Sequence, residues 1–181
     1  MPPSTRSLLV LGGARSGKSG FAQRAAEQSG LAPLFLATGQ AFDGEMADRI
    51  ARHKSGRGAR WALCEEPLEL ADALAREARP GRIVLLDCAT LWLSNLMHAG
   101  RDLDAEGAAL AAALASPDGP VIVVSNEVGS GIVPDNAMAR RFRDAQGRLN
   151  QVLAQACDRV VLVSAGLPLL LKPQPMPPLS F

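Results

Sequence analysis

Two stretches of the sequence carry residue types that could handle phosphate chemistry. The first, Gly12–Ser19, reads GGARSGKS and matches the pattern G-x-x-x-x-G-K-[ST]. Glycines in this pattern let backbone N–H groups turn toward phosphate oxygens, and the following helix directs its positive N-terminus at them. Lys18 is expected to reach the β- and γ-phosphates, and the Ser19 hydroxyl to ligate Mg²⁺. An apolar run precedes the motif and a helical pattern follows it, which disfavours a chance glycine turn.

The second stretch, RIARHKSGRGARW, contains His53, one of two histidines in the chain. An isolated histidine near a helix end is more often a cap or a surface residue than a catalyst. Cations surround it and could hold phosphates: Arg49, Arg52, Lys54 and Arg57. They would also disfavour the imidazolium, which keeps the ring neutral and nucleophilic near pH 7. The spacing alone leaves a surface role and a nucleophilic role open.

Two carboxylates follow apolar runs that are typical of strands. Asp87 ends the run RIVLLD, where it could hold Mg²⁺ directly or through water, or cap the next helix. The sheet order expected for a phosphate-loop protein favours the metal role. Glu127 follows the run VIVVSN and could orient a nucleophile or pair with an arginine. Its role stays open.

Composition limits the class of protein. Of 181 residues, 48% are hydrophobic and the net charge is +1, which argues against a surface built for nucleic acid or anionic membrane. Cys64, Cys88 and Cys157 form no CxxC pair, so a structural zinc site is not expected and reduced thiols are. No apolar run approaches the roughly 20 residues that span a bilayer, and the N-terminal run is too short for a signal peptide. We expect a cytoplasmic protein.

Strand-like and helix-like segments alternate along the chain. Strands are expected at 7–13, 33–39, 82–87, 119–127, 158–166 and, as a short edge strand, 167–173. Helices are expected at 18–28, 45–54, 67–79, 91–97, 103–115 and 135–157. This order predicts one α/β P-loop domain over 1–181, with a mostly parallel sheet and helices on both faces. Residues 1–6 and 173–181 are expected to be loose ends.

Four segments together resemble the bifunctional adenosylcobinamide kinase/adenosylcobinamide-phosphate guanylyltransferase family of cobalamin synthesis. They read LGGARSGKSGFAQ, FLATGQAFDGEMADRIARHKSGR, LLDCATLWLSNLM and VIVVSNEVGSGIVP. The similarity runs in order from about Leu8 to Lys172. Many proteins share the phosphate loop, whereas A-T-G, R-I-x-x-H-[KR]-x-G-R and S-N-E-V-G-x-G-I-V-P together are far more specific. The resemblance implies a P-loop sheet related to the RecA type and a homotrimer.

The resemblance also implies two reactions that use GTP and ATP as substrates, with Mg²⁺. A nucleoside triphosphate phosphorylates adenosylcobinamide. GTP then guanylylates a histidine, and the GMP passes to adenosylcobinamide phosphate to give adenosylcobinamide-GDP. The family's guanylylated histidine matches His53.

The resemblance places the nucleotide on several motifs of this chain. The phosphates fall on the loop residues Gly12, Gly13, Ala14, Arg15, Ser16, Gly17, Lys18 and Ser19. Further contacts fall on Ala37, Thr38, Gly39, Lys54, Ser55, Gly56, Arg57, Glu65 and Asp87. Mg²⁺ falls on Ser19 and Asp87.

Two other functions compete with this interpretation. Another small-molecule P-loop kinase would use Lys18, Ser19 and Asp87 but leave His53 idle. A nucleotide-dependent regulatory protein would hydrolyse slowly and act through a partner. Covalent guanylylation would exclude the former, and rapid phosphorylation of adenosylcobinamide the latter.

Overall fold

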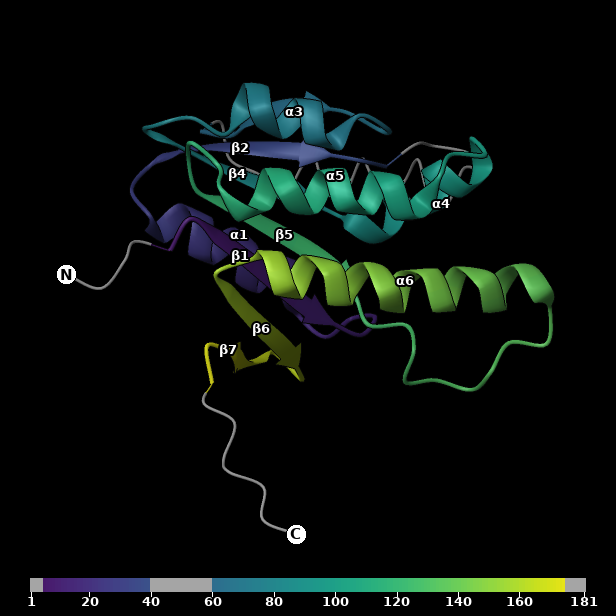
Figure 1. The fold of residues 1–181 in the computed structure, drawn as a ribbon. Helices are drawn as coiled ribbons and strands as arrows, with labels where there is room; N and C mark the ends of the chain where they lie inside the picture. The colour runs from purple at the N-terminus through teal and green to yellow at the C-terminus, as the bar shows by residue number, and fades with distance from the viewer. Residues whose placement is uncertain (1–4, 40–59, 175–181) are drawn as a thin grey trace, which may run out of the picture.

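A computed structural model describes residues 5–39 and 60–174 of the chain. These ranges build a seven-stranded sheet in the order β3-β2-β4-β5-β1-β6-β7 (Figure 1). The strands are β1 (Ser7–Gly12), β2 (Ala32–Ala37), β3 (Ala62–Glu65), β4 (Arg82–Asp87), β5 (Val121–Asn126), β6 (Arg159–Ser164) and β7 (Leu167–Lys172). Strands β1 to β6 pair in parallel, and β7 runs antiparallel to β6. The expected mostly parallel sheet is confirmed.

Helices cover both faces of the sheet, as expected. They are α1 (Lys18–Gln28), α3 (Leu70–Glu77), α4 (Ala89–His98), α5 (Leu103–Ala115) and α6 (Ala137–Ala156). Helix α1 packs on one face, and α3, α4, α5 and α6 pack on the other (Figure 1). The two apolar clusters are therefore separated by the sheet.

The central strands are apolar on both sides because both faces are covered. In β1, Leu9 and Leu11 contribute to the cluster under α3–α6, whereas Val10 lies in the cluster with α1. The same alternation holds in β5, where Val123 faces α3–α6 and Val124 faces α1. This alternation decides which polar residues at the strand ends face α1.

Some element boundaries differ from the sequence expectation. Strand β3 was not expected, because its four residues are short, mostly exposed and lack an apolar run. The helix expected from residue 67 begins only at Leu70, since the Glu66 side chain accepts hydrogen bonds from Leu68 N and Glu69 N and forms a turn there. The C-terminal edge strand is confirmed as β7.

The N-terminal loose end is shorter than expected. Arg6 N donates to the Asp158 carboxylate at 2.7 Å, and Arg6 O accepts from Val121 N at 2.8 Å, so Arg6 is already part of the ordered fold. At the other end, Lys172 Nζ donates to three carbonyls at the end of α6, which ties β7 to that helix. The rest of the expected ends, 1–4 and 175–181, and the helix expected at 45–54 lie outside the described residues.

Within the described ranges, no helix is both long and apolar enough to cross a membrane. Trp92 is buried against the core, and its indole N–H donates to Leu68 O at 2.7 Å. Trp61 is half-buried and packs edge-on against Phe35 with ring centroids 6.3 Å apart. All three cysteines are free thiols.

Candidate functional site

The phosphate loop joins the end of β1 to the start of α1 and needs glycine at two points. A Cβ on Gly12 would lie 2.6 Å from Val163 O on the neighbouring strand and 2.4 Å from Ser16 Oγ. Gly17 has φ +93°, a conformation that side-chain-bearing residues rarely adopt, and a Cβ there would approach Gly166 Cα at 3.2 Å. The loop therefore owes its shape to the absence of side chains where it passes under β6.

Hydrogen bonds close the loop on itself. Ser16 N donates to Gly13 O at 3.3 Å, and Ser16 O accepts from Gly166 N at 2.8 Å. The buried Lys18 side chain donates to Gly13 O at 3.1 Å, so the ammonium group lies across the loop. This arrangement holds a positive charge beside backbone N–H groups, which is what a bound phosphate requires.

The start of α1 carries no competing anion. Its N-cap is Gly17, with no side-chain capping bond, and its first turn contains no acidic residue. The first N–H groups of a helix lack intrahelical partners, and the helix dipole favours negative charge there. Ser16 Oγ is buried and has no hydrogen-bond partner among the described residues. The helix start is therefore prepared for an external anion.

The second half of the site lies at the carboxyl ends of β2, β3 and β4. Ala37 pairs in register with Glu65 on one side and with Asp87 on the other. The register thus brings these three residues, which the resemblance had singled out, to one level of the sheet. Asp87 belongs to the α1 face, because Ile83 and Leu85 of the same strand pack in the α1 cluster.

Thr38 has a structural function that the sequence did not indicate. It is fully buried, and its hydroxyl donates to Cys88 O at 2.8 Å while accepting from Cys88 N at 3.1 Å. The hydroxyl links β2 to the turn after β4. A ligand at this position would meet the backbone around Gly39 rather than the threonine side chain.

Sequence reasoning also missed Asn95 of α4. Its amide donates to Thr38 O at 2.7 Å and to Pro67 O at 3.0 Å, so one buried side chain joins the ends of β2 and β3. The available signal was an asparagine among apolar neighbours in LWLSNLM. A polar residue on the buried face of a helix needs hydrogen-bond partners, and here the partners are strand ends.

The cysteines are not candidates for nucleophilic catalysis. Burial raises the pKa of Cys88 to about 11 and that of Cys157 to about 12. Burial, and then the nearby Glu77 carboxylate, raises the pKa of the half-buried Cys64. A raised pKa leaves the thiol protonated and a poor nucleophile near neutral pH.

Two further candidate residues, Ser19 and Glu127, lie at or beside the loop. Ser19 is half-buried on the first turn of α1, and Glu127 N donates to Gly12 O at 3.0 Å, which places Glu127 beside the loop. In residues 5–39 and 60–174, no three His, Cys, Asp or Glu side chains form a metal-binding group. His53, Lys54, Ser55, Gly56 and Arg57 lie outside the described residues.

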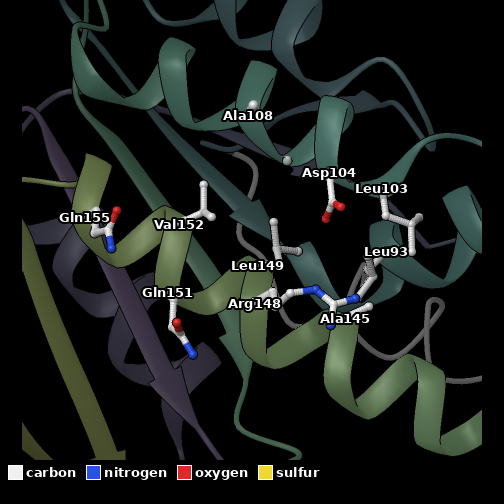
Figure 2. Close-up of a pocket in the computed structure, with 11 residues that line it drawn as sticks. Leu93, Leu103, Asp104, Ala108, Ala145, Arg148, Leu149, Gln151, Val152 and Gln155 are labelled. Carbon is white, nitrogen blue, oxygen red and sulfur yellow. The ribbon is translucent and has the colours of Figure 1, made fainter.

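A separate hollow lies between α5 and α6, on the face of the sheet away from α1. It has a volume of about 440 Å³ and a largely apolar lining that includes Leu149 and Val152. Figure 2 shows Asp104 of α5 and Arg148 of α6 toward the same end of it. Because the sheet separates this hollow from α1, it is not part of the site around Gly12–Ser19.

Comparisons with known proteins give a matching family and similar relatives. Residues 8–171 match the family described as cobinamide kinase / cobinamide phosphate guanyltransferase. The bifunctional adenosylcobalamin biosynthesis protein CobP of Pseudomonas aeruginosa is 50% identical over 170 residues, covering 93% of this chain and 98% of its own. The corresponding CobU proteins are 42% identical in Salmonella typhimurium (88% and 96% coverage) and 40% in Escherichia coli (88% and 96%).

Two solved structures are similar to this chain at low sequence identity. A prototypical ATPase from a bacterial type III secretion system superposes with a TM-score of 0.51 at 11% identity, over 87% of this chain and 50% of the other. The P4 protein from bacteriophage phi6 in complex with ADP gives a TM-score of 0.47 at 15% identity, over 92% and 55%. This chain spans about half the length of each. The likeness to the ATPase supports the P-loop α/β fold alone.

Proposed function

The chain belongs to the cobinamide kinase and cobinamide phosphate guanyltransferase family, and from this premise we propose the reactions of its site. It is a bifunctional enzyme of cobalamin biosynthesis. In the first reaction, a hydroxyl of adenosylcobinamide takes the γ-phosphoryl group of ATP or GTP. In the second, GMP passes from GTP to adenosylcobinamide phosphate, giving adenosylcobinamide-GDP. The observation that carries this function is the family match over residues 8–171, which includes the loop and Asp87.

For phosphoryl transfer, Gly12–Ser19 binds the triphosphate. The N–H groups of the loop and the first turn of α1 donate to phosphate oxygens, and Lys18 neutralises charge on the β- and γ-phosphates. The hydroxyl of Ser19 and the carboxylate of Asp87 would hold Mg²⁺. An oxygen donor set of this kind, completed by phosphate oxygens and water, fits that ion. The metal would offset the charge that develops on the bridging oxygens.

For guanylyl transfer, the neutral imidazole of His53 attacks the α-phosphorus of GTP. A nitrogen–phosphorus bond forms, the bond to the bridging oxygen breaks, and pyrophosphate leaves. A phosphate oxygen of adenosylcobinamide phosphate then attacks the same phosphorus and releases the imidazole. Two displacements replace one difficult transfer. Lys54, Ser55, Gly56 and Arg57 would hold phosphate oxygens during both displacements.

The remaining nucleotide contacts fall on the second half of the site. Ala37, Thr38 and Gly39 would contact GTP through their backbone, since the Thr38 side chain is buried and bonded to Cys88. Glu65 would contact the nucleoside, because the β3 register places it at the level of Ala37. These positions stand on the same side of the site as Asp87.

We also propose a homotrimer that works in the cytoplasm. Strand β7 is the edge of the sheet and exposes leucines, with Leu167 at 73% and Leu169 at 57% exposure. An exposed apolar edge strand favours contact with another chain. The free cysteines fit a reducing compartment. Light scattering of the purified protein would test the assembly.

The experiment that tests the function is an intact-mass measurement after incubation with GTP and Mg²⁺, denatured without acid. A GMP-sized gain that is absent in His53→Ala and lost in mild acid is expected, because phosphoramidates are acid-labile. His98→Ala is the matched control, since the exposed His98 lies at the end of α4 and bonds to Ser94 O. No adduct despite GTP binding would leave a kinase without guanylyltransferase activity.

Kinase activity is tested separately by formation of adenosylcobinamide phosphate. His53→Ala should retain this reaction in part, because γ-phosphoryl transfer does not need the imidazole. Equal loss of both activities, in a variant that folds and binds GTP, would contradict the divided roles.

A further inference from the structure

The end of β5 lies between the two halves of the site. Strand β5 pairs with β1 on one side and β4 on the other. Asn126, its last residue, is in register with Gly12, the first glycine of the phosphate loop. Two residues earlier, Val124 is in register with Asp87. Asn126 therefore stands one strand from the loop and one strand from the carboxylate that would hold Mg²⁺.

The side chain of Asn126 projects on the α1 face. Side chains alternate along a strand. Ile122 and Val124 pack in the cluster with α1, while Ser125 bonds to α6 on the opposite face. Asn126 thus shares the face of Asp87, where the phosphate loop turns into α1. The residue is half-buried, and its amide makes no hydrogen bond within the part of the chain that the structure describes.

The backbone of Asn126 is held by side chains instead of by a strand. The pairing of β4 with β5 ends at Asp87 opposite Val124, so the last residues of β5 have no strand on that side. Thr90 Oγ1 accepts from Asn126 N at 2.8 Å, and Asn150 Nδ2 donates to Asn126 O at 3.0 Å. These two bonds replace the missing ladder and fix both polar groups of the Asn126 backbone.

A buried network of hydrogen bonds fixes Asn150, which holds the Asn126 carbonyl. Asn150 Oδ1 accepts from Ser125 Oγ at 2.7 Å and from Gln146 Nε2 at 2.9 Å, and Gln146 Nε2 also reaches Ser125 Oγ at 2.9 Å. Ser125 and Gln146 are fully buried, and Asn150 is 5% exposed. Polar side chains at this depth are costly unless they are bonded. The fold thus places three bonded polar side chains behind the half-buried amide of Asn126.

We propose that Asn126 is a further catalytic residue whose amide donates to the terminal phosphates of the bound nucleotide. Thr90 and Asn150 are the positioning residues that hold it. The inference rests on the proposed function, in which Gly12–Ser19 binds the triphosphate and Lys18 reaches its β- and γ-phosphates. A donor between the loop and Asp87 faces the phosphates on which charge develops during transfer.

The direct test compares Asn126→Ala with the isosteric Asn126→Asp. Loss of a hydrogen bond to a charged group lowers kcat for adenosylcobinamide phosphorylation about 10- to 100-fold in Asn126→Ala, with KM for the corrinoid unchanged. Asn126→Asp loses more, because a carboxylate repels the phosphates. Wild-type rates in either variant, or an Asn126→Ala protein that does not fold, would overturn the inference.

The positioning residues are tested by a conservative pair and by a double-mutant cycle. Thr90→Ser keeps the oxygen that accepts from Asn126 N and retains activity, whereas Thr90→Val removes that oxygen and lowers kcat. Asn150→Leu lowers kcat in the wild-type background but not in Asn126→Ala, since it acts through Asn126. Equal losses in both backgrounds would mean that Asn150 is only structural. Gln151→Ala, an exposed neighbour on α6, is the control.

Nucleotide binding separates failure of this inference from failure of the proposed function. A fluorescence titration needs no corrinoid, and Asn126→Ala should raise Kd for GTP about tenfold while leaving Kd for GMP unchanged. A wild-type protein without corrinoid activity would contradict the proposed function but leave this comparison intact. Unchanged GTP affinity together with unchanged kcat would contradict the role of Asn126 alone.

Discussion

The two halves of the carboxyl edge are built in different ways. On the β1 side, the backbone shapes the phosphate loop, and the decisive residues are glycines that leave room for Ser16 and Val163. On the β2–β4 side, buried side chains hold the strand ends, through the bonds of Thr38 to Cys88 and of Asn95 to Thr38. The β1 side is therefore shaped by the backbone of glycines without side chains, and the β2–β4 side by hydrogen bonds from buried side chains.

This difference has a chemical reason. Phosphate oxygens are bound by backbone N–H groups and a helix start, so the β1 side must bring the main chain itself close to the ligand. In the proposed function, the β2–β4 side instead presents a carboxylate, Asp87, at a defined point. A side chain at a strand end is positioned by fixing the strands around it, which Asn95 and Thr38 do.

The largest effect should come from Lys18, the buried cation of the loop on the β1 side. Lys18→Ala removes the ammonium that lies across the loop, and both reactions need the triphosphate held. We expect kcat/KM of each to fall about 100- to 1,000-fold. Steady-state rates with adenosylcobinamide, and with its phosphate and GTP, measure this.

Arg24→Ala is the matched control for Lys18→Ala. Arg24 is an exposed cation on the same helix, so its removal tests whether any positive charge on α1 would have the same effect. Similar losses in the two variants would mean that the loop attracts nucleotide by general electrostatics. The comparison between the two halves would then lose its chemical basis.

The next largest effect should come from adding one methyl group to the loop. In Gly12→Ala, the new Cβ would lie 2.6 Å from the Val163 carbonyl oxygen, which is held in β6 and cannot turn away. We expect the free energy of unfolding to fall by about 2–3 kcal/mol. Urea denaturation measures it. Gly147→Ala on α6, where a Cβ meets nothing within 4 Å, should instead stabilise the protein by up to about 1 kcal/mol.

The two halves also differ in how far the sequence could predict them. The backbone-built half is local: GGARSGKS spans eight successive residues, and the spacing of its glycines determines its shape. The strand before it and the helix 18–28 after it were predicted with the same bounds or within one residue. The apolar runs of β4, β5 and β6 are equally local signals, and their alternation with helical segments predicted the mostly parallel sheet.

The side-chain-built half could not be predicted in this way. Thr38 and Cys88 are 50 residues apart and Asn95 lies 57 residues after Thr38, so only the folded register brings them together. Strand β3 was missed for a related reason, since it is defined by pairing with β2 and not by its own apolar pattern. His53 lies outside the described residues, so its catalytic role stays a prediction from the resemblance.

A smaller effect on stability is expected when the β2–β4 side loses the hydrogen bonds of Asn95. Asn95→Ala leaves the Thr38 and Pro67 carbonyls without their donor in a buried place, which should lower the free energy of unfolding by about 2 kcal/mol. Ser94→Ala, the preceding residue on α4, should change it by less than about 0.5 kcal/mol. Urea denaturation of the wild type, Asn95→Ala and Ser94→Ala measures both changes in the free energy of unfolding. If Asn95→Ala were as stable as Ser94→Ala, hydrogen bonds would not be what holds this half.

The smallest effect should come from a residue outside both halves. Cys157 follows α6, and burial raises its pKa from 9.0 to about 12 in the folded protein. Above pH 9 the unfolded chain releases the thiol proton while the folded protein keeps it, so stability falls as pH rises from 9 toward 12. At pH 10 the loss through this group is about 1 kcal/mol. Cys157→Ala should remove that part of the pH dependence, measured by urea denaturation at pH 8 and pH 10.

The GTP affinity of Cys157→Ala at pH 8 should equal that of the wild type, because Cys157 follows the far end of α6 and neither half of the site depends on it. If the stability of the two proteins changed with pH in parallel, the pKa of Cys157 would not differ between the folded and unfolded states. A weaker GTP affinity in Cys157→Ala would show that residues outside the two halves help to hold the site.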